Sequence, residues 1–280
     1  MITINNKPLD INQFPDGTPR INFNPVDCFN PLPNRKITIT WTYENDAEMF
    51  YLMCIKRKVD ETGNSVVCEL LLPYVPNARM DRIKGINEVF TLKYFCDFIN
   101  WLNFNKVLVL DPHSDVTPAL LNNCRCINPS EYVSHVISLV RPDILYFPDA
   151  GAAKRYSSLF PSKRYCYGEK ERDWKTGNIL GLNIRTNGLD LNDKTVLMID
   201  DIISYGGSLY YSAEELKKTG VGKIYAYATH TENSILDKEK GTLIKSLENG
   251  IIEKLFTSDS LFTKEHEKIH VIGGWKNGRY

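Results

Sequence analysis

Short apolar runs, rich in β-branched and aromatic residues, recur along this chain and alternate with helical patterns. The runs are KITITWT (36–42), VVCELLLPY (66–74), KVLVLD (106–111), DILYFPD (143–149), TVLMID (195–200), KIYAYAT (223–229) and KLFT (254–257). Apolar residues at helical spacing predict helices over 46–59, 88–103, 130–140, 209–218 and 235–248. Strands that alternate with helices favour parallel sheets covered on both sides, so we predict an α/β protein.

The chain contains two segments with a weakly similar sequence pattern, which suggests two related halves. KVLVLDPHSD and TVLMIDDIISYGGSL both read as a strand, then acidic residues, then a loop that leads into a helix. Between them, Asn128-Pro129-Ser130 resembles a connector followed by a helix start. We therefore expect an N-terminal domain over 1–128 and a C-terminal domain over 129–263, with the segment 264–280 as a candidate to return to the first domain.

Composition excludes several classes of function. The chain has 34 Lys+Arg and 34 Asp+Glu, so it has no net positive charge that would favour binding to nucleic acid or to an anionic membrane. No apolar stretch approaches the length of a membrane-spanning helix, and MITINNKPLD lacks the regions of a signal peptide. The seven cysteines form no CxxC pair, which favours reduced thiols over disulfides or a zinc site. These features predict a cytoplasmic protein with no nucleic-acid or membrane partner.

The segment Thr195–Leu209 is the first candidate for a functional site. Its apolar run ends in Asp200 and Asp201, and a turn with Gly206 and Gly207 follows. Ser208 is expected to cap the next helix. Glycine N–H groups and a helix N-terminus favour a phosphate, and paired carboxylates suit sugar hydroxyls or a cation. A sugar phosphate bound with Mg²⁺ fits this pattern, and the alternative is an ordinary strand-to-helix connection.

Other segments carry residues of the same chemical kind. They are Phe14-Pro15-Asp16-Gly17, PYVPNARMDR (73–82), Asp111-Pro112-His113-Ser114, PDAGAAKR (148–155) and Thr229-His230. A polar stretch over 168–181, GEKERDWKTGNILG, reads either as a mobile lid or as a solvated surface loop. A single histidine such as His113 is more often a packed residue than a ligand, and its place after a strand and Asp111 favours contact with a metal or phosphate.

Taken in order, these segments resemble the ribose-phosphate pyrophosphokinases, also called phosphoribosyl pyrophosphate synthetases. Members of that family carry FPDGE-like, PYARQDR, DLHS and PDAGG segments, a KRR-type catalytic loop and DDxxDTGGT. The resemblance covers nearly the whole chain. It implies two phosphoribosyltransferase-like domains, each a mostly parallel sheet flanked by helices, with the active site between them. It also implies transfer of the β,γ-pyrophosphate of ATP to the anomeric hydroxyl of ribose 5-phosphate.

The resemblance implies a role for each matching residue. His113 and Asp149 match the Mg²⁺-contacting positions, and Lys170, Arg172 and His113 match catalytic ones. Asp200 and Asp201 would hold the ribose hydroxyls, and Gly206, Gly207 and Ser208 the sugar phosphate. ATP would be bound by Arg79, Asp81 and Arg82, with Phe14 and Asp16 holding adenine from a neighbouring subunit. The implied partners are thus ATP, Mg²⁺, a ribose phosphate and further copies of this chain.

The chain also departs from the family pattern. Ser204 and Tyr205 stand where the family has an acid and a threonine, Thr18 replaces the acid of FPDGE, and Met80 replaces a glutamine. One explanation keeps ribose 5-phosphate as acceptor, bound through Ser208 and backbone groups. The other is an acceptor with more than a monophosphate at the 5-position, such as ADP-ribose, whose adenosine would stack on Tyr205. The product would then be ADP-ribose 1-pyrophosphate, and either nucleotide or NAD biosynthesis is a candidate for its use.

Two rival functions remain at this stage. A phosphoribosyltransferase would explain the segment from Asp200 to Ser208, and it leaves PYVPNARMDR and the Lys170-x-Arg172 loop without a role. A non-catalytic regulatory homologue would lack the catalytic cations and metal ligands that this chain retains. The sequence leaves open the acceptor, the oligomeric state, allosteric control and the downstream pathway.

Overall fold

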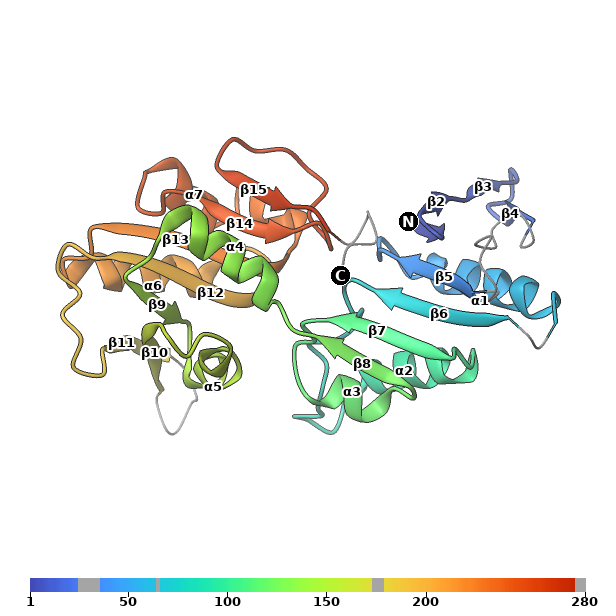
Figure 1. Ribbon diagram of the computed structural model, residues 1–280, viewed down its shortest axis with the longest axis horizontal. Coiled ribbons are helices and arrows are strands. Elements are labelled where there is room, and N and C mark those ends of the chain that lie inside the picture. The colour runs from blue at the N-terminus through green and yellow to red at the C-terminus, as the bar shows by residue number, and fades with distance from the viewer. Residues whose placement is uncertain (25–35, 64–65, 173–178, 275–280) are drawn as a thin grey trace. The chain divides into compact units, whose positions relative to one another are not determined.

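The computed structural model describes residues 1–24, 36–63, 66–172 and 179–274 (Figure 1). Its chain divides into two compact units. Of the described residues, the first holds Met1–Asn128 and Gly274, and the second holds Pro129–Gly273. In the described ranges, no helix has the length and apolar character needed to cross a membrane.

The first unit is built on a six-stranded sheet in the order β2-β1-β5-β6-β7-β8. Strands β5 (Lys36–Trp41), β6 (Val67–Leu72), β7 (Lys106–Leu110) and β8 (Cys124–Ile127) are parallel. The short β1 (Ile2–Ile4) and β2 (Lys7–Pro8) extend one edge in antiparallel fashion. The helices are α1 (Ala47–Asp60), α2 (Thr91–Trp101) and α3 (Val116–Leu120), and β3 (Asp10–Gln13) pairs with β4 (Pro19–Asn22) in a separate hairpin.

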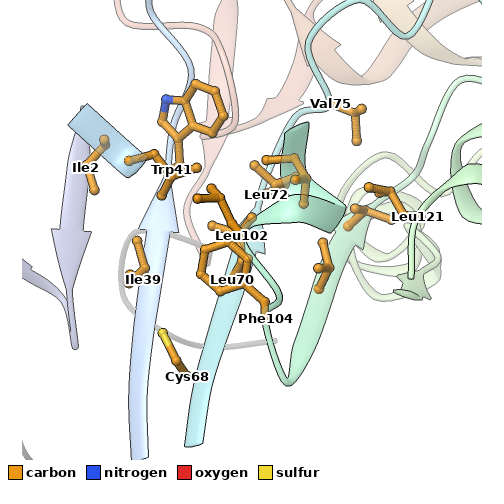
Figure 2. Close-up of a cluster of buried hydrophobic side chains, with 14 of the residues drawn as sticks. Ile2, Ile39, Trp41, Cys68, Leu70, Leu72, Val75, Leu102, Phe104 and Leu121 are labelled. Atoms are coloured by element: carbon orange, nitrogen blue, oxygen red, sulfur yellow. The ribbon is translucent and has the colours of Figure 1, made fainter. Parts of the chain in front are cut away.

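One apolar cluster holds this unit together (Figure 2). Ile39 from β5 and Leu70 and Leu72 from β6 are fully buried in it, beside Trp41. The indole Nε1 of Trp41 donates to Glu48 Oε2 at 2.8 Å, so this buried carboxylate has a partner. Helix α1 supplies Glu48, and its own apolar residues join the same cluster. The packing therefore fixes α1 against the strands that lead to the candidate site.

The second unit contains a seven-stranded sheet in the order β11-β10-β9-β12-β13-β14-β15. Its strands are β9 (Ile144–Phe147), β10 (Arg164–Arg172), β11 (Ile179–Arg185), β12 (Thr195–Ile203), β13 (Lys223–Thr231), β14 (Leu255–Ser258) and β15 (Ile269–Ile272). All neighbours are parallel except β10 and β11. The helices are α4 (Ser130–Val140), α5 (Ala150–Tyr156), α6 (Gly207–Lys218) and α7 (Leu243–Glu248).

Alternate residues of the central strands pack into two separate cores. In β12, Leu197 and Ile199 pack with residues of α4 and α5, whereas Val196 and Met198 pack with residues of α6 and α7. Successive side chains of a strand point to opposite faces, so both faces of this sheet are covered. This explains why the strand reads as an unbroken apolar run and confirms the predicted α/β class.

Three local predictions were wrong or incomplete. The helix expected over 235–248 is a 3₁₀ turn at Asn233–Leu236 followed by the short α7. The interruption has a cause, because Asp237 Oδ1 accepts from the N–H groups of Glu239 and Lys240 at 2.9 and 2.8 Å. Strand β12 extends to Ile203, so the acid pair lies inside it. Gly206, not Ser208, is the N-cap of α6, and Ser208 is the second residue of the helix.

Candidate active site

The acid pair lies in the middle strand of the second sheet. Asp201 is 6% exposed, and its Oδ2 lies 3.6 Å from Nη1 of Arg155 on α5. The backbone N–H of Asp201 also donates to Asp200 Oδ1 at 2.9 Å. Burial, followed by the charge of Asp201, raises the pKa of the Asp200 carboxyl well above its usual value. Two acids that resist ionising together are suited to accept hydrogen bonds from neighbouring hydroxyls of a ligand.

Asp149 lies beside this pair. It follows β9, the parallel neighbour of β12, and its negative charge contributes to the raised pKa of Asp200. Its Oδ1 accepts from the Ala152 N–H at 2.9 Å, so the carboxylate caps α5, and the residue is exposed to solvent. The structure thus gathers Asp149, Asp200 and Asp201 at the carboxyl ends of adjacent strands, where ligands of open α/β sheets bind.

A glycine turn joins β12 to α6 and is fixed by the segment before α7. The carbonyl oxygen of Tyr205 accepts from Thr242 N at 2.9 Å, Thr242 Oγ1 at 2.8 Å and Leu243 N at 3.2 Å. Gly206 has a φ of 84°. The first N–H groups of α6, at Gly207 and Ser208, have no intrahelical acceptor. Such N–H groups at a helix N-terminus form an anion site, so the turn can bind a phosphate.

Replacing Gly206 by alanine is expected to destabilise the protein by about 2–4 kcal/mol. A Cβ here would collide with Leu243 Cβ, and the positive φ disfavours any L side chain. Gly207→Ala is the matched control, because a Cβ there would meet Thr242 Oγ1 only at 3.7 Å and Tyr211 Cε2 at 4.0 Å. Urea unfolding of both variants measures the difference. Equal losses of stability would show that the turn is not clamped as described.

The catalytic residues expected on the polar stretch lie on a hairpin rather than an irregular loop. Lys170 pairs with Leu182, and Arg172 with Ile179, in the β10–β11 ladder. Only the first part of β10 pairs with β9, so positions 170 and 172 extend past the carboxyl end of that strand. The side chains of Lys170 and Arg172, and residues 173–178, lie outside the described part of the chain.

The first unit carries the residues expected to bind ATP. Arg79 follows β6 and is exposed, and the half-buried His113 follows the adjacent parallel strand β7. The carboxyl ends of parallel strands meet at one edge, so both residues lie along the same edge of this sheet. Asp81 is 8% exposed and pairs with Arg82 through Oδ1 and Nε at 3.1 Å. Of the two expected magnesium ligands, His113 belongs to the first unit and Asp149 to the second.

Phe14 and Asp16 lie at the tip of the β3–β4 hairpin. Phe14 is 50% exposed. Asp16 Oδ1 accepts from the backbone N–H of Thr18 at 3.0 Å and from its hydroxyl at 2.7 Å. These bonds, with the hydroxyl bond as the larger cause, lower the pKa of Asp16. Thr18, which replaces the acid expected in this segment, therefore holds the turn that presents Phe14.

Some residues of the site carried no sequence signal. Arg155 was within the PDAGAAKR segment without an assigned role, and its pairing with Asp201 depends on the packing of α5 beside β12. Lys240 lies over the ring of Tyr205, with Nζ 5.9 Å from the ring centroid. His230, by contrast, is 3% exposed and its Nδ1 lies 2.8 Å from Ser260 Oγ, which makes it part of a buried polar cluster. Among the described residues, no three His, Cys, Asp or Glu side chains form a metal-binding group.

Several curated proteins have a sequence similar to this chain. No protein-family model matches the sequence. The ribose-phosphate pyrophosphokinase of Pyrococcus abyssi is 27% identical over 233 residues, which cover 79% of this chain and 75% of that protein. The enzyme of the same name from Vibrio cholerae is 23% identical over 267 residues, or 90% of this chain and 78% of the relative. The chain is thus similar to ribose-phosphate pyrophosphokinases over most of its length.

The fold agrees with this family along almost the whole chain. A crystal structure of phosphoribosylpyrophosphate synthetase from Mycobacterium smegmatis matches with a TM-score of 0.72 and 15% sequence identity. The match covers 95% of this chain and 86% of that one. The family resemblance predicted from the ordered segments is therefore confirmed, as is the architecture of mostly parallel sheets flanked by helices.

Proposed function

We propose that this chain is a pyrophosphokinase that transfers the β,γ-pyrophosphate of ATP to the anomeric hydroxyl of a 5-phosphorylated ribose. The observation that carries the proposal is the acid pair followed by the clamped glycine turn on β12. The carboxylates of Asp200 and Asp201 accept from the ribose hydroxyls, and the N–H groups of Gly207 and Ser208 bind the 5-phosphate. This arrangement fixes the sugar at both ends and leaves its anomeric oxygen as the reacting atom.

The reaction forms one bond and breaks one. The anomeric oxygen attacks the β-phosphorus of ATP, the bond from that phosphorus to the α–β bridging oxygen breaks, AMP leaves and the proton of the anomeric hydroxyl is released to solvent. Such transfers depend on alignment and charge neutralisation. Arg79 binds the phosphates of ATP through its planar fork, and Lys170 and Arg172 stabilise charge that develops on the transferred group.

Magnesium fits the donors that the site offers. Asp149 is an exposed acid, and the Asp200 carboxyl is close enough to respond to its charge. Hard carboxylate oxygens are the ligands that Mg²⁺ prefers, together with substrate phosphates. Asp149 would hold the ion, which supplies neutralisation of the phosphate oxygens when bound.

Two acceptors fit the sugar site. Ribose 5-phosphate needs only the glycine turn and the acid pair, and gives phosphoribosyl pyrophosphate. ADP-ribose needs space beyond the first phosphate, and gives ADP-ribose 1-pyrophosphate. Tyr205, which stands where the family has a small hydroxyl residue, is 39% exposed beside the turn and favours the larger acceptor slightly. The hairpin tip with Phe14 and Asp16 would contact adenine bound to a second copy in a homo-oligomer.

The purified chain is expected to release AMP from ATP when Mg²⁺ and an acceptor are supplied. Chromatography of the nucleotides and ³¹P NMR of the product would measure AMP and the new pyrophosphate ester, with ribose 5-phosphate and ADP-ribose assayed in parallel. A phosphoribosyltransferase would release no AMP from ATP, and a regulatory homologue would leave ATP intact. ADP as the nucleotide product would also contradict the proposal, because it means that only the γ-phosphoryl group moved.

A further inference from the structure

A lysine stands next to the proposed phosphate turn, and nothing so far gives it a role. Lys240 Nζ lies over the ring of Tyr205, 5.9 Å from its centroid. The two residues come from different connections, one after β12 and the other before α7. Tyr205 directly precedes the N-cap of α6, so the ring that the cation contacts belongs to the residue next to the turn that would bind the sugar phosphate.

The backbone holds Lys240 in this position. Its N–H donates to Asp237 Oδ1 at 2.8 Å, and the N–H of Gly241 donates to the Asp237 carbonyl at 2.9 Å. A Cβ at Gly241 would lie only 2.6 Å from the carbonyl oxygen of Ile235, so the turn is tight. Two residues further on, Thr242 is bonded to the Tyr205 carbonyl through both its N–H and its hydroxyl. Short-range hydrogen bonds therefore connect the backbone of Lys240, through Thr242, to the turn at Tyr205.

The charges around Lys240 leave it available to an anion. Glu239 is adjacent to it in sequence and exposed, and Asp237 lies three residues before it, where its carboxylate already accepts from two N–H groups. The bonds from Lys240 and Glu239 lower the pKa of Asp237, and the charge of Lys240 adds to the effect. An exposed cation–π contact contributes only about 0.5–1 kcal/mol. A phosphate oxygen, which forms a charge-assisted hydrogen bond, would compete successfully for the ammonium group.

We propose that Lys240 determines acceptor specificity by binding a second phosphate, attached to the phosphate held at the α6 N-terminus. The acceptor class is then a ribose whose 5-position carries a diphosphate ester, as in a nucleoside diphosphate-linked ribose. A monophosphate is satisfied by the turn itself and leaves the lysine unused. Tyr205 is a positioning residue here, because its ring holds the ammonium group beside the turn. This inference rests on the proposed function.

A second ring offers a surface for the group beyond the diphosphate. Tyr211 is 60% exposed, and its Cε2 lies 4.0 Å from the place of a Cβ on Gly207. Residues four apart on a helix lie one above the other, so Tyr211 flanks the first turn of α6. A base that stacks on an aromatic side chain gains about 1–3 kcal/mol. A nucleoside joined to the second phosphate would find this ring on the same helix that binds the first.

Steady-state kinetics on the full chain test the proposal with ADP-ribose and ribose 5-phosphate as acceptors. Lys240→Gln is expected to raise the KM for ADP-ribose about tenfold, the effect of one charge-assisted hydrogen bond, with kcat nearly unchanged. The KM for ribose 5-phosphate should stay within about twofold. Lys238→Gln is the matched control, since it removes an equal charge from the same exposed connection. Tyr205→Phe should match wild type, whereas Tyr205→Leu should raise the KM for ADP-ribose only.

The outcomes separate this inference from the proposed function. Equal KM changes for both acceptors, or none, would overturn the role of Lys240. Turnover with ribose 5-phosphate and none with ADP-ribose would also overturn the role of Lys240, and it would establish pyrophosphate transfer. If no acceptor supports AMP release, calorimetric titration with ADP-ribose still decides: the proposal requires Lys240→Gln to weaken binding about tenfold while Lys238→Gln does not. Equal affinities of the two variants would refute it.

Discussion

Replacing Asp200 by asparagine is expected to abolish nearly all pyrophosphate transfer and to make the ligand-free protein more stable at pH 7. The loss of kcat/KM should reach at least about 10²-fold, because each ribose hydroxyl would exchange a hydrogen bond to a charged group for a weaker one. A substitution that lowers activity and raises stability identifies a residue that is needed for function and destabilises the folded protein.

The pH dependence follows from the direction of the pKa shift. Burial and the charge of Asp201 raise the pKa of Asp200 in the folded protein, so the native state binds this proton more tightly than the unfolded chain does. Stability therefore falls as pH rises from the unfolded value, near 3.8, through the raised folded pKa. Asparagine cannot ionise, so its advantage should be absent near pH 4 and grow toward neutral pH.

Thermal unfolding in EDTA without nucleotide or sugar would measure this effect at several pH values. Asp201→Asn is the informative partner variant, because it removes the negative charge that faces Arg155 and should lose activity with no gain in stability. Glu253→Gln removes an exposed acid of the same unit and should change neither quantity. A melting temperature of Asp200→Asn equal to wild type at pH 7 would mean that Asp200 is not held in an unfavourable charged site.

The sequence predicted the strands of both sheets well, and the reason is physical. A strand such as β12, buried on both faces, must be apolar at every position, and this makes Thr195–Asp200 conspicuous. The antiparallel additions were missed, and so were the parallel edge strands β8 and β15. Strands β1 and β2 are short, and the polar residues of the β10–β11 hairpin read as a loop because their pairing, not apolar burial, defines them. Edge and hairpin strands therefore carry little signal in composition.

The candidate site carries a sequence signal where it lies on one segment and none where it depends on packing. Asp200, Gly206 and Gly207 are neighbours in sequence, so their chemistry is visible in the chain itself. Arg155 and Lys240 reach the site only through the folded sheet. Lys240 was also concealed by apolar residues at helical spacing over 235–248, where the side chain of Asp237 diverts the backbone into a turn. A short-range hydrogen bond outweighed the periodicity.

Replacing Lys170 by alanine is expected to lower kcat by about 10³-fold, the scale at which one cation placed on a transferred phosphoryl group acts. The fold should persist. Lys170 takes part in the ladder through its backbone, which pairs with Leu182, and this pairing does not depend on the lysine side chain. Lys170→Arg keeps the positive charge and is expected to retain more activity than the alanine variant.

Arg185→Ala on the other strand of the hairpin is the matched control. Arg185 pairs with Tyr167, and its Nε donates to Glu169 Oε2 at 2.7 Å, so the change removes a cation from the same structural element. An exposed ion pair of this kind contributes about 0–1 kcal/mol, and kcat should be nearly unchanged. Circular dichroism and the KM for ATP would establish that each variant is folded and binds nucleotide. Catalysis by charge neutralisation requires the cation only during transfer of the pyrophosphate, so the effect of Lys170→Ala should be on kcat. A kcat within about threefold of wild type would show that this hairpin takes no part in catalysis.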